Sequence, residues 1–232
     1  MRDEMITGVE ALAKVPLFTG LPTNELERLG TLVRARRYRR GEVIFLEGDI
    51  GTSLCVIALG QVRIVLSGAD GREVVLNVYG PGNFFGEFAL LDGEPRSADA
   101  IAQEGCLLYW LTREDFLMFL ESHPRAASTL LAVLSRRLRH TTRVVQDATF
   151  RDVPARLARV VLDLATTRGR PDGDWVIVDG PFTQTDLAAM VGASRETVNK
   201  ALRAFERGGM LRHERGAITV MRPDRLRDRG NP

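Results

Sequence analysis

Residues 85–98 combine side chains that could bind a phosphate and a sugar at one place. The run reads Phe-Gly-Glu-Phe-Ala-Leu-Leu-Asp-Gly-Glu-Pro-Arg-Ser-Ala. Gly86 would let backbone N–H groups approach a ligand, a short helical turn after it would favour an anion, and Arg96 could pair with phosphate oxygens. Ser97 adds a hydroxyl donor, whereas Glu87 suits a sugar hydroxyl. These features indicate a nucleotide site; a strand-connecting turn with an Arg–Glu surface pair is the alternative.

A second run, residues 182–202, has the pattern of a helix-turn-helix. Such a motif needs a small residue where its helices pack, a glycine at the turn and apolar residues behind the second helix. These needs are met by Ala188, Gly192, Val198 and Leu202. The side chains expected to contact DNA are Thr183, Thr185, Ser194, Arg195, Glu196, Thr197, Asn199 and Lys200. In the major groove Arg suits guanine and Glu suits the amino group of cytosine. An ordinary helix with an i,i+4 surface pair of Glu196 and Lys200 is the alternative.

Short β-prone segments separated by glycine-containing turns must position the first run. They follow a short helical start and a helix through Leu32, and they are residues 32–38, 42–46, 53–58, 62–66, 73–78, 98–102 and 106–111. Turn signals between them include Ala69-Asp70-Gly71 and Gly80-Pro81-Gly82-Asn83. This regular spacing predicts a β-barrel or jelly roll.

The hydrophobic period then becomes helical. Thr112 can cap a helix through about Glu121, and Pro124 suits the first turn of a longer helix that ends near Phe150. Residues of a heptad seam recur along it at alternating steps of four and three: Ala127, Leu131, Leu134, Leu138, Thr141, Val145 and Ala148. Such a seam predicts a dimer. Packing on its own barrel is the alternative, and Leu130 with Val133 offers a second apolar flank for that contact.

Asp152 and Pro154 mark a hinge, because Asp is a good N-cap and proline fits a first helical turn. The elements expected after it are a helix from Ala155 to about Thr167, a loop at 168–174, a strand at 175–178, helices at 183–190 and 194–207, and a hairpin at 210–213 and 217–221 around Arg215-Gly216. The hairpin would be the wing of a winged helix-turn-helix. The prediction is therefore an α+β chain with a β-barrel domain at 1–121, a dimerisation helix and hinge at 122–151, and a DNA-binding domain at 152–232.

The composition is that of an ordinary globular protein of two small domains. The chain has 232 residues, of which 44% are hydrophobic and 27% charged. Residues 151–232 carry 15 Lys and Arg against 11 Asp and Glu, so the C-terminal third is the basic part. No apolar run approaches the length of a membrane span and no signal peptide is apparent, so a cytoplasmic protein is expected. Cys55 and Cys106 are expected to be buried thiols in strands.

Two resemblances connect these runs to known proteins. Gly86-Glu87 followed by Arg96-Ser97-Ala98 resembles the phosphate-binding cassette of cyclic-nucleotide-binding domains. The run Ser-Arg-Glu-Thr-Val at 194–198 resembles the recognition helix of the cyclic-AMP receptor protein and fumarate-nitrate regulator (CRP/FNR) superfamily of bacterial transcription regulators. The resemblance implies that Arg96 neutralises a cyclic phosphate and that Glu87 accepts from the ribose 2′-hydroxyl. Gly86, Phe88 and Ser97 would complete the cassette.

Within that superfamily, the sequence is most similar to the cyclic-AMP receptors. Thr141-Thr142 matches the two adjacent hydroxyl residues that meet the adenine, although Thr-Ser is more usual there. No cysteine precedes Cys55 and no histidine precedes His123, so neither an iron–sulfur cluster nor a haem is expected, and no metal ligand spacing emerges. The implied effector is cyclic AMP.

The resemblance also implies partners: double-stranded DNA at palindromic TGTGA-like sites, a second copy of the chain, RNA polymerase, and no membrane. Two regulators of the same fold remain as alternatives, one that needs no effector and one that responds to another cyclic nucleotide. A cyclic-nucleotide-regulated enzyme or channel subunit is disfavoured, because the three histidines are scattered and the helix-turn-helix lies in a basic region.

Overall fold

The computed structural model describes residues 6–68, 73–180, 182–214 and 216–230. The chain divides into two compact units, one of residues 1–66 and 76–139 and the other of residues 67–75 and 140–232. Within the described residues the strands form three four-stranded sheets. The predicted α+β class is confirmed, while the predicted turns at 69–71 and at Arg215 fall outside the described residues.

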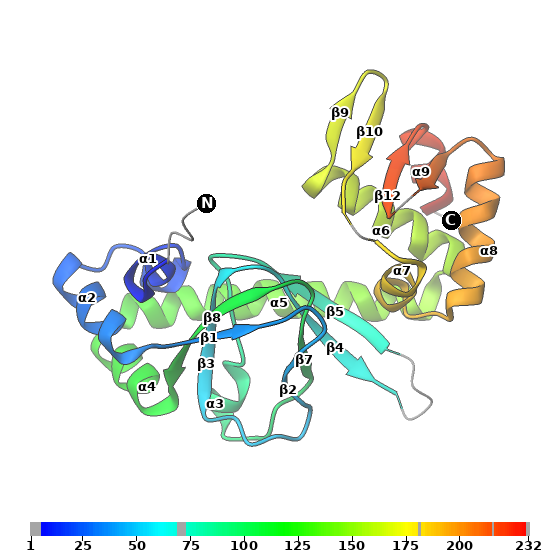
Figure 1. Cartoon of the computed structure of the whole chain (residues 1–232). Coiled ribbons are helices and arrows are strands. Elements are labelled where there is room, and N and C mark those ends of the chain that lie inside the picture. Colours follow the sequence, from blue (N-terminus) through cyan, green and yellow to red (C-terminus); the bar gives the residue numbers. More distant parts are fainter. Residues whose placement is uncertain (1–5, 69–72, 181, 215, 231–232) are drawn as a thin grey trace. The chain divides into compact units, whose positions relative to one another are not determined.

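Two antiparallel sheets form the centre of the first unit (Figure 1). One has the order β1-β8-β3-β6, with bounds Arg34–Tyr38, Cys106–Thr112, Ser53–Leu59 and Phe84–Phe85. The other has the order β2-β7-β4-β5, with bounds Val43–Phe45, Asp99–Ala102, Val62–Ser67 and Glu73–Tyr79. The jelly-roll prediction is confirmed by this arrangement. Both cysteines are buried and free, as expected, in β3 and β8.

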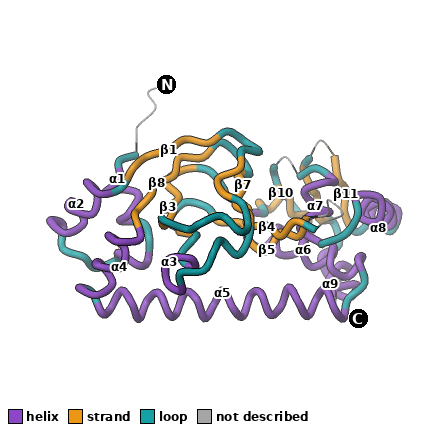
Figure 2. The backbone as a smooth tube through the Cα atoms, turned by 90° about the horizontal axis from the view of Figure 1, so that it is seen from below, coloured by secondary structure: helices purple, strands orange, loops and turns teal. Residues whose placement is uncertain are grey.

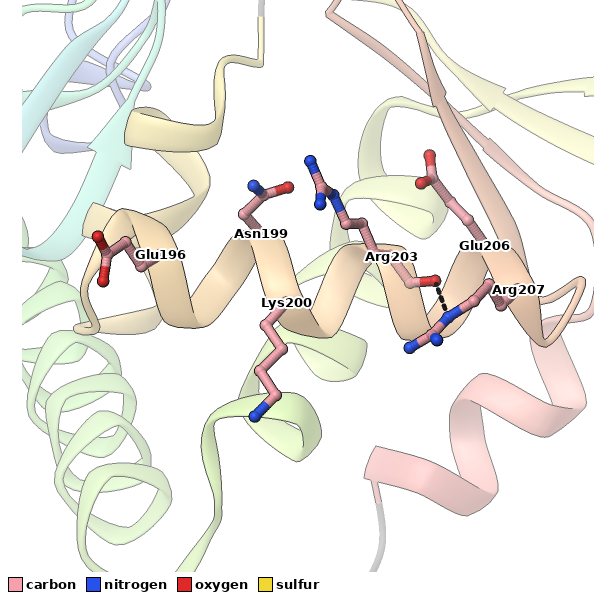
Figure 3. A pocket seen from close by; sticks show the side chains of 6 residues that line it. All are labelled: Glu196, Asn199, Lys200, Arg203, Glu206 and Arg207. Atoms are coloured by element: carbon pink, nitrogen blue, oxygen red, sulfur yellow. Dashed lines mark hydrogen bonds between the residues drawn. The ribbon is translucent and has the colours of Figure 1, made fainter.

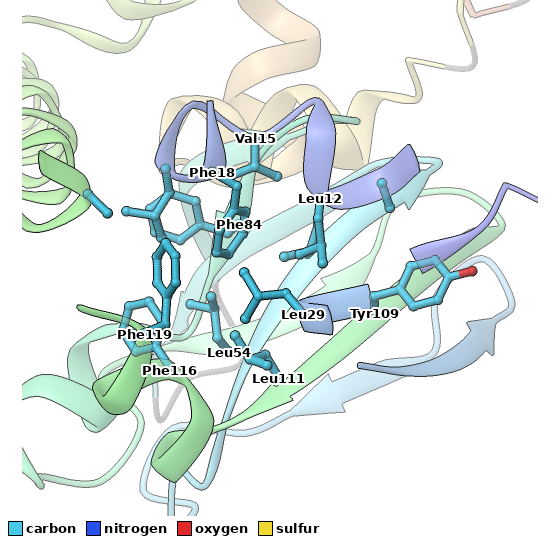
Figure 4. Close-up of a cluster of buried hydrophobic side chains, with 14 of the residues drawn as sticks. Leu12, Val15, Phe18, Leu29, Leu54, Phe84, Tyr109, Leu111, Phe116 and Phe119 are labelled. Atoms are coloured by element: carbon cyan, nitrogen blue, oxygen red, sulfur yellow. The ribbon is translucent and has the colours of Figure 1, made fainter. Parts of the chain in front are cut away.

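Strand β3 is buried on both faces, because helices cover the side of its sheet that the second sheet does not. Leu54 and Val56 join the apolar cluster shared with the helices, whereas Cys55 and Ile57 join the cluster shared with the second sheet. Figure 4 shows the helical side of this core, with Phe18, Phe116 and Phe119 close together. The helices of this unit are α1 (Gly8–Ala13), η1 (Pro16–Phe18), α2 (Thr23–Leu32), α3 (Phe88–Asp92) and α4 (Arg113–Ser122).

Helix α5 (Pro124–Phe150) is a single continuous helix (Figure 2). Its first turns pack on the barrel through Ala126 and Leu130, which are buried, and through Val133 and Leu134, which are partly buried. Three other apolar residues at heptad spacing are exposed, with 65% of Leu131, 69% of Leu138 and 58% of Val145 accessible. The helix therefore has the two apolar flanks predicted, although the predicted seam residue Leu134 contributes to the barrel core.

The second unit surrounds one apolar core built from helices and a small sheet. Its elements are α6 (Val153–Arg168), β9 (Arg170–Asp172), β10 (Trp175–Val178), α7 (Gln184–Val191), α8 (Arg195–Arg207), β11 (Leu211–Glu214), β12 (Ala217–Val220) and α9 (Pro223–Gly230). The sheet order is β11-β12-β10-β9. Asp152, Thr183 and Ser194 each accept a backbone N–H as N-cap, which confirms the predicted helix starts. No helix in the described part of the chain is long and apolar enough to cross a membrane.

Three elements were not predicted: one is a short strand in a local hairpin, and the other two depend on contacts between distant residues. The expected loop at 168–174 contains β9, which pairs with β10 around Gly173. Strand β6 is two residues long and is defined by its pairing with β3. Helix α9 follows Arg222, where the sequence alone gave no assignment, and Leu226 is its buried anchor in the core of the second unit.

Leu226→Ala tests whether α9 is an integral part of the second unit. Leu226 is 0% exposed, so its truncation should lower the free energy of unfolding by about 2–5 kcal/mol. Urea unfolding followed by circular dichroism measures this loss. Arg227→Ala is the matched control on the same helix, because its side chain is 62% exposed and should change stability by about 0.5 kcal/mol or less. Equal stability of the two variants would show that α9 does not stabilise the fold.

Candidate functional sites

The first candidate site begins where β6 ends, at a glycine whose backbone no other residue readily adopts. Gly86 has φ +82°, in the left-handed region, and a Cβ built there would lie 2.4 Å from Nη1 of Arg96. The sequence predicted a glycine that lets a ligand approach the backbone. The structure adds a second reason: the guanidinium of Arg96 occupies the space that a side chain at residue 86 would take.

Arg96 is a buried cation held by neutral groups. It is 5% exposed, donates from Nη1 to the Gly86 carbonyl at 2.6 Å and from Nη2 to the Ser53 carbonyl at 2.8 Å, and lies 4.2 Å above the ring centroid of Phe45. Its Nε has no hydrogen-bond partner within the described residues. Burial lowers the pKa of Arg96, because desolvation disfavours the charged form. Burial has removed the water that would otherwise solvate this guanidinium. An anion bound here would take the place of that water as its partner.

Glu87 is paired with a residue that the sequence did not identify. Glu87 is 2% exposed, and Arg137 of α5 donates from Nη1 to its carboxylate and from Nη2 to the carbonyl of Phe84. The Arg137 guanidinium also lies 4.5 Å from the ring centroid of Tyr79 and 4.8 Å from that of Phe84. A buried pair 50 residues apart in the chain replaces the surface Arg–Glu pair considered from sequence, so that alternative is wrong.

The other predicted cassette residues are more open. Phe88 begins α3 and is 45% exposed, and Ser97 is exposed beside Arg96. Thr141 and Thr142 are exposed residues of α5. Thr141 follows Arg137 by four residues and therefore lies on the same side of that helix.

The helix-turn-helix has the local features predicted for it. Thr183 and Asp186 form a capping box at the start of α7. Gly192 ends α7 in the left-handed conformation, with φ +65°. Ala188 is buried, and Val198 and Leu202 place the apolar side of α8 in the core. The hydroxyl of Ser194 accepts the Thr197 N–H, so the first turn of α8 begins directly after the turn.

Most predicted DNA-contacting side chains lie on the surface. Arg195, Glu196, Thr197 and Lys200 are exposed, as are Thr183 and Thr185 at the start of α7. No ion pair between Glu196 and Lys200 occurs among the described residues, which argues against the surface-pair alternative. Asn199 is half-buried and accepts a hydrogen bond from Gln184 of α7 at 3.1 Å. That bond fixes the side chain that was expected to contact a base.

More residues of α8 line its exposed surface than the sequence alone predicted. A shallow hollow runs along the helix and is lined by Glu196, Asn199, Lys200, Arg203, Glu206 and Arg207 (Figure 3). Arg203 and Arg207 continue the basic side beyond the first two turns, and the Nε of Arg207 donates to the Arg203 carbonyl. They follow Lys200 by three and seven residues, and this helical spacing could have identified them from the sequence. Cations at this end of α8 are of the type that contacts phosphates in protein–DNA complexes.

Two family models match the chain, one over each candidate site. The cyclic nucleotide-binding domain matches residues 35–123, which include Gly86, Glu87 and Arg96. The Crp-like helix-turn-helix domain matches residues 155–229, which include α7, α8 and most of α9.

Whole-chain relatives carry both parts. The chain is 35% identical over 217 residues to a CRP-like cAMP-activated global transcriptional regulator of Mycobacterium tuberculosis, covering 94% of this chain and 97% of the relative. It is 36% identical to the cyclic AMP receptor protein of Thermus thermophilus, covering 88% and 92%. Among solved structures, the c-di-GMP responsive global regulator CLP of Xanthomonas campestris is 26% identical, with a TM-score of 0.77 and coverage of 86% and 99%.

Arg137→Met tests the buried pair beside the cassette. Removal of the guanidinium leaves the Glu87 carboxylate buried without its counter-charge, so the free energy of unfolding should fall by about 3–5 kcal/mol. The double variant Glu87→Gln, Arg137→Met removes both charges and should regain most of that loss. Urea unfolding at neutral pH measures both effects. Arg136→Met, an exposed neighbour on α5, is the control, and a loss equal to that of Arg137→Met would show that the pair is not responsible.

Proposed function

Since the chain belongs to the CRP/FNR superfamily of bacterial transcription regulators, we propose that it is a homodimeric regulator whose binding to DNA is controlled by cyclic AMP. The observation that carries the proposal is Arg96, a buried guanidinium with an unpaired Nε and with neutral carbonyl partners. A cyclic phosphate brings one negative charge, which suits this single cation. The names of the Mycobacterium and Thermus relatives favour cyclic AMP as the nucleotide.

The remaining parts of cyclic AMP are assigned to the residues around Arg96. Glu87 accepts from the ribose 2′-hydroxyl, and Arg137 holds the carboxylate in position to do so. Ser97 adds a hydroxyl to the phosphate, and the backbone at Gly86 and Phe88 provides close approach. Thr141 and Thr142 meet the adenine, in keeping with the position of Thr141 one turn beyond Arg137.

The exposed flank of α5 is the proposed binding surface for a second copy of the chain. Leu131, Leu138 and Val145 are seven residues apart and more than half exposed, which is the spacing of a coiled-coil seam. Thr141 lies within the same heptad pattern, so each adenine would be read at the dimer seam. Because a two-fold dimer presents two equal recognition helices, its site on DNA is a palindrome read in successive major grooves about 34 Å apart. The likeness to the CRP/FNR superfamily favours TGTGA-like half-sites.

Cyclic AMP acts in this proposal by changing the populations of two arrangements of the dimer. The nucleotide binds the DNA-competent arrangement more tightly than the other, and by linkage DNA then raises the affinity for the nucleotide by the same factor. RNA polymerase is the partner on which the DNA-bound regulator acts. A regulator that responds to another cyclic nucleotide is the second candidate, because the Xanthomonas relative is described as responsive to c-di-GMP.

Arg96→Leu tests the nucleotide site. Loss of a charge-assisted bond to the phosphate should cost roughly 1.5–3 kcal/mol, which is about tenfold or more in affinity for cyclic AMP. Isothermal titration with cyclic AMP, cyclic GMP and c-di-GMP in parallel identifies the effector. Arg39→Leu changes an exposed arginine of the same unit and should bind as the wild type does.

Two results would contradict the proposal. Unchanged affinity in Arg96→Leu would show that the nucleotide binds elsewhere. A wild type that selects TGTGA-like fragments from genomic DNA while binding none of the three nucleotides would be an effector-independent regulator.

Leu131→Asp tests the dimer seam. In a two-fold seam each aspartate would face its symmetry mate across an apolar contact, so the protein should become monomeric without losing its fold. Light scattering with detection of molar mass measures this change. Met118→Asp is the matched control, because Met118 of α4 is 50% exposed and lies outside the seam. A Leu131→Asp variant that remains dimeric would place the interface on another surface.

A further inference from the structure

Arg156, in the first turns of α6, donates to carbonyl groups of two other segments of the second unit. Its Nε donates to the Val191 carbonyl at 2.9 Å, and its Nη2 lies 3.4 Å from the Gly192 carbonyl. Its Nη1 donates to the Arg151 carbonyl at 3.0 Å and lies 3.4 Å from that of Ala148. One guanidinium thus joins the end of α5 to the turn of the helix-turn-helix.

All four acceptors lie at helix C-termini or directly after them. Ala148 is in the last turn of α5, and Arg151 follows that helix. Val191 is the last residue of α7, and Gly192 is its C-cap. Carbonyls at such ends have no partner within their own helix and carry the negative end of the helix dipole. A half-buried guanidinium with five donors in a fixed plane can serve both ends together.

The segment between α5 and α6 is also fixed from another side. Asp152 caps α6 through the Ala155 N–H at 2.8 Å and accepts from Arg229 of α9 at 2.7 Å. Arg151 donates to the Gly230 carbonyl of α9. The hinge is therefore attached to α6 and α9, and Arg156 extends these attachments to the turn that precedes α8.

We propose that Arg156 is a positioning residue that couples the end of α5 to the recognition helix α8. The turn at Gly192 leads through Ala193 directly to Ser194, the N-cap of α8. A displacement of the α5 end is passed through the Arg156 guanidinium to the carbonyls of this turn, and so to the first turn of α8. The role of cyclic AMP in producing that displacement rests on the proposed function, whereas the connection between hinge and turn does not.

Two variants of Arg156 distinguish a role that needs the shape of the guanidinium from a role that needs only a positive charge. Arg156→Ala removes the connection. Arg156→Lys keeps the charge, but a single ammonium group cannot reach both helix ends in the way a planar guanidinium does. Arg159→Ala is the matched control: Arg159 is one turn further along α6 and pairs with Asp147 of α5 at 3.3 Å, and none of its contacts in the described chain reaches the turn at Gly192.

Hydrogen exchange in the full chain measures the connection without any ligand. The Gly192 and Ala193 N–H groups donate to Ala189 and Ala188, so their exchange reports how firmly the turn is held. Exchange should be about fivefold faster or more in both Arg156 variants and within about twofold of wild type in Arg159→Ala. Wild-type exchange in Arg156→Lys would overturn the proposal, and this variant retains the long stem should the alanine variant not fold.

Fluorescence titration with a DNA duplex containing the selected site measures the coupling. The ratio of DNA affinities with and without cyclic AMP should fall by roughly fivefold or more in the Arg156 variants but not in Arg159→Ala. The slope of log affinity against log salt should stay at its wild-type value. A slope reduced by about one would identify Arg156 as a phosphate contact and overturn the proposal. A wild type that does not respond to cyclic AMP would refute the proposed effector, and the exchange result would still decide the role of Arg156.

Discussion

A guanidinium removed from water is costly unless the protein surrounds it with acceptors, and the cassette is organised around this requirement at Arg96. Its acceptors are the carbonyls of Gly86 and Ser53, and Phe45 covers one face of the ion. Gly86 must be a glycine for the ion to fit, and a Cβ at Gly51 would approach the guanidinium to 3.2 Å. Because these partners are neutral, the positive charge is not cancelled by a carboxylate bond. The burial that costs stability in the free protein is thus in keeping with the proposed role of Arg96 as the partner of a cyclic phosphate.

Helix α5 satisfies three separate requirements with different sides of one helix. Ala126 and Leu130 belong to the barrel core, and Arg137 reaches into the cassette to Glu87. Leu131, Leu138 and Val145 remain on the surface at a spacing of seven residues. A helix that packed only on its own barrel would not need a row of exposed apolar residues on a third side. The exposed flank is therefore best explained by a partner helix, and the barrel contact explains why Leu134 is less exposed than its heptad neighbours.

Most parts of the structure that depend on local sequence could be predicted, the hairpin strand β9 being an exception, and those that depend on distant contacts could not. Thr112, Asp152, Thr183 and Ser194 mark helix starts by the hydrogen bonds of their own side chains, so each start was correctly placed. The glycine and arginine of the cassette were identified by spacing. Arg137 was missed because its partner is 50 residues away and nothing distinguishes it from the other arginines of α5. Strand β6 and helix α9 were missed for the same reason, since each is defined by pairing or packing with a remote element.

Two arginines that bind backbone carbonyls, Arg137 and Arg156, suggest how a signal could travel along this chain. Arg137 contacts the cassette through Glu87 and the Phe84 carbonyl, and Arg156 contacts the last turn of α5 and the turn before α8. From Arg137 to Ala148, eleven residues further along α5, the chain is continuous α-helix that rises about 16 Å at about 1.5 Å per residue. No loop interrupts this stretch, so helical backbone alone connects the two contacts along the chain. The residues between α5 and α6 are Arg151 and Asp152. Arg156 and Arg229 hold this segment by hydrogen bonds to the Arg151 carbonyl and the Asp152 carboxylate. A switch between two DNA affinities requires an element with two discrete arrangements, and the hydrogen bonds across this segment are our candidate for that element.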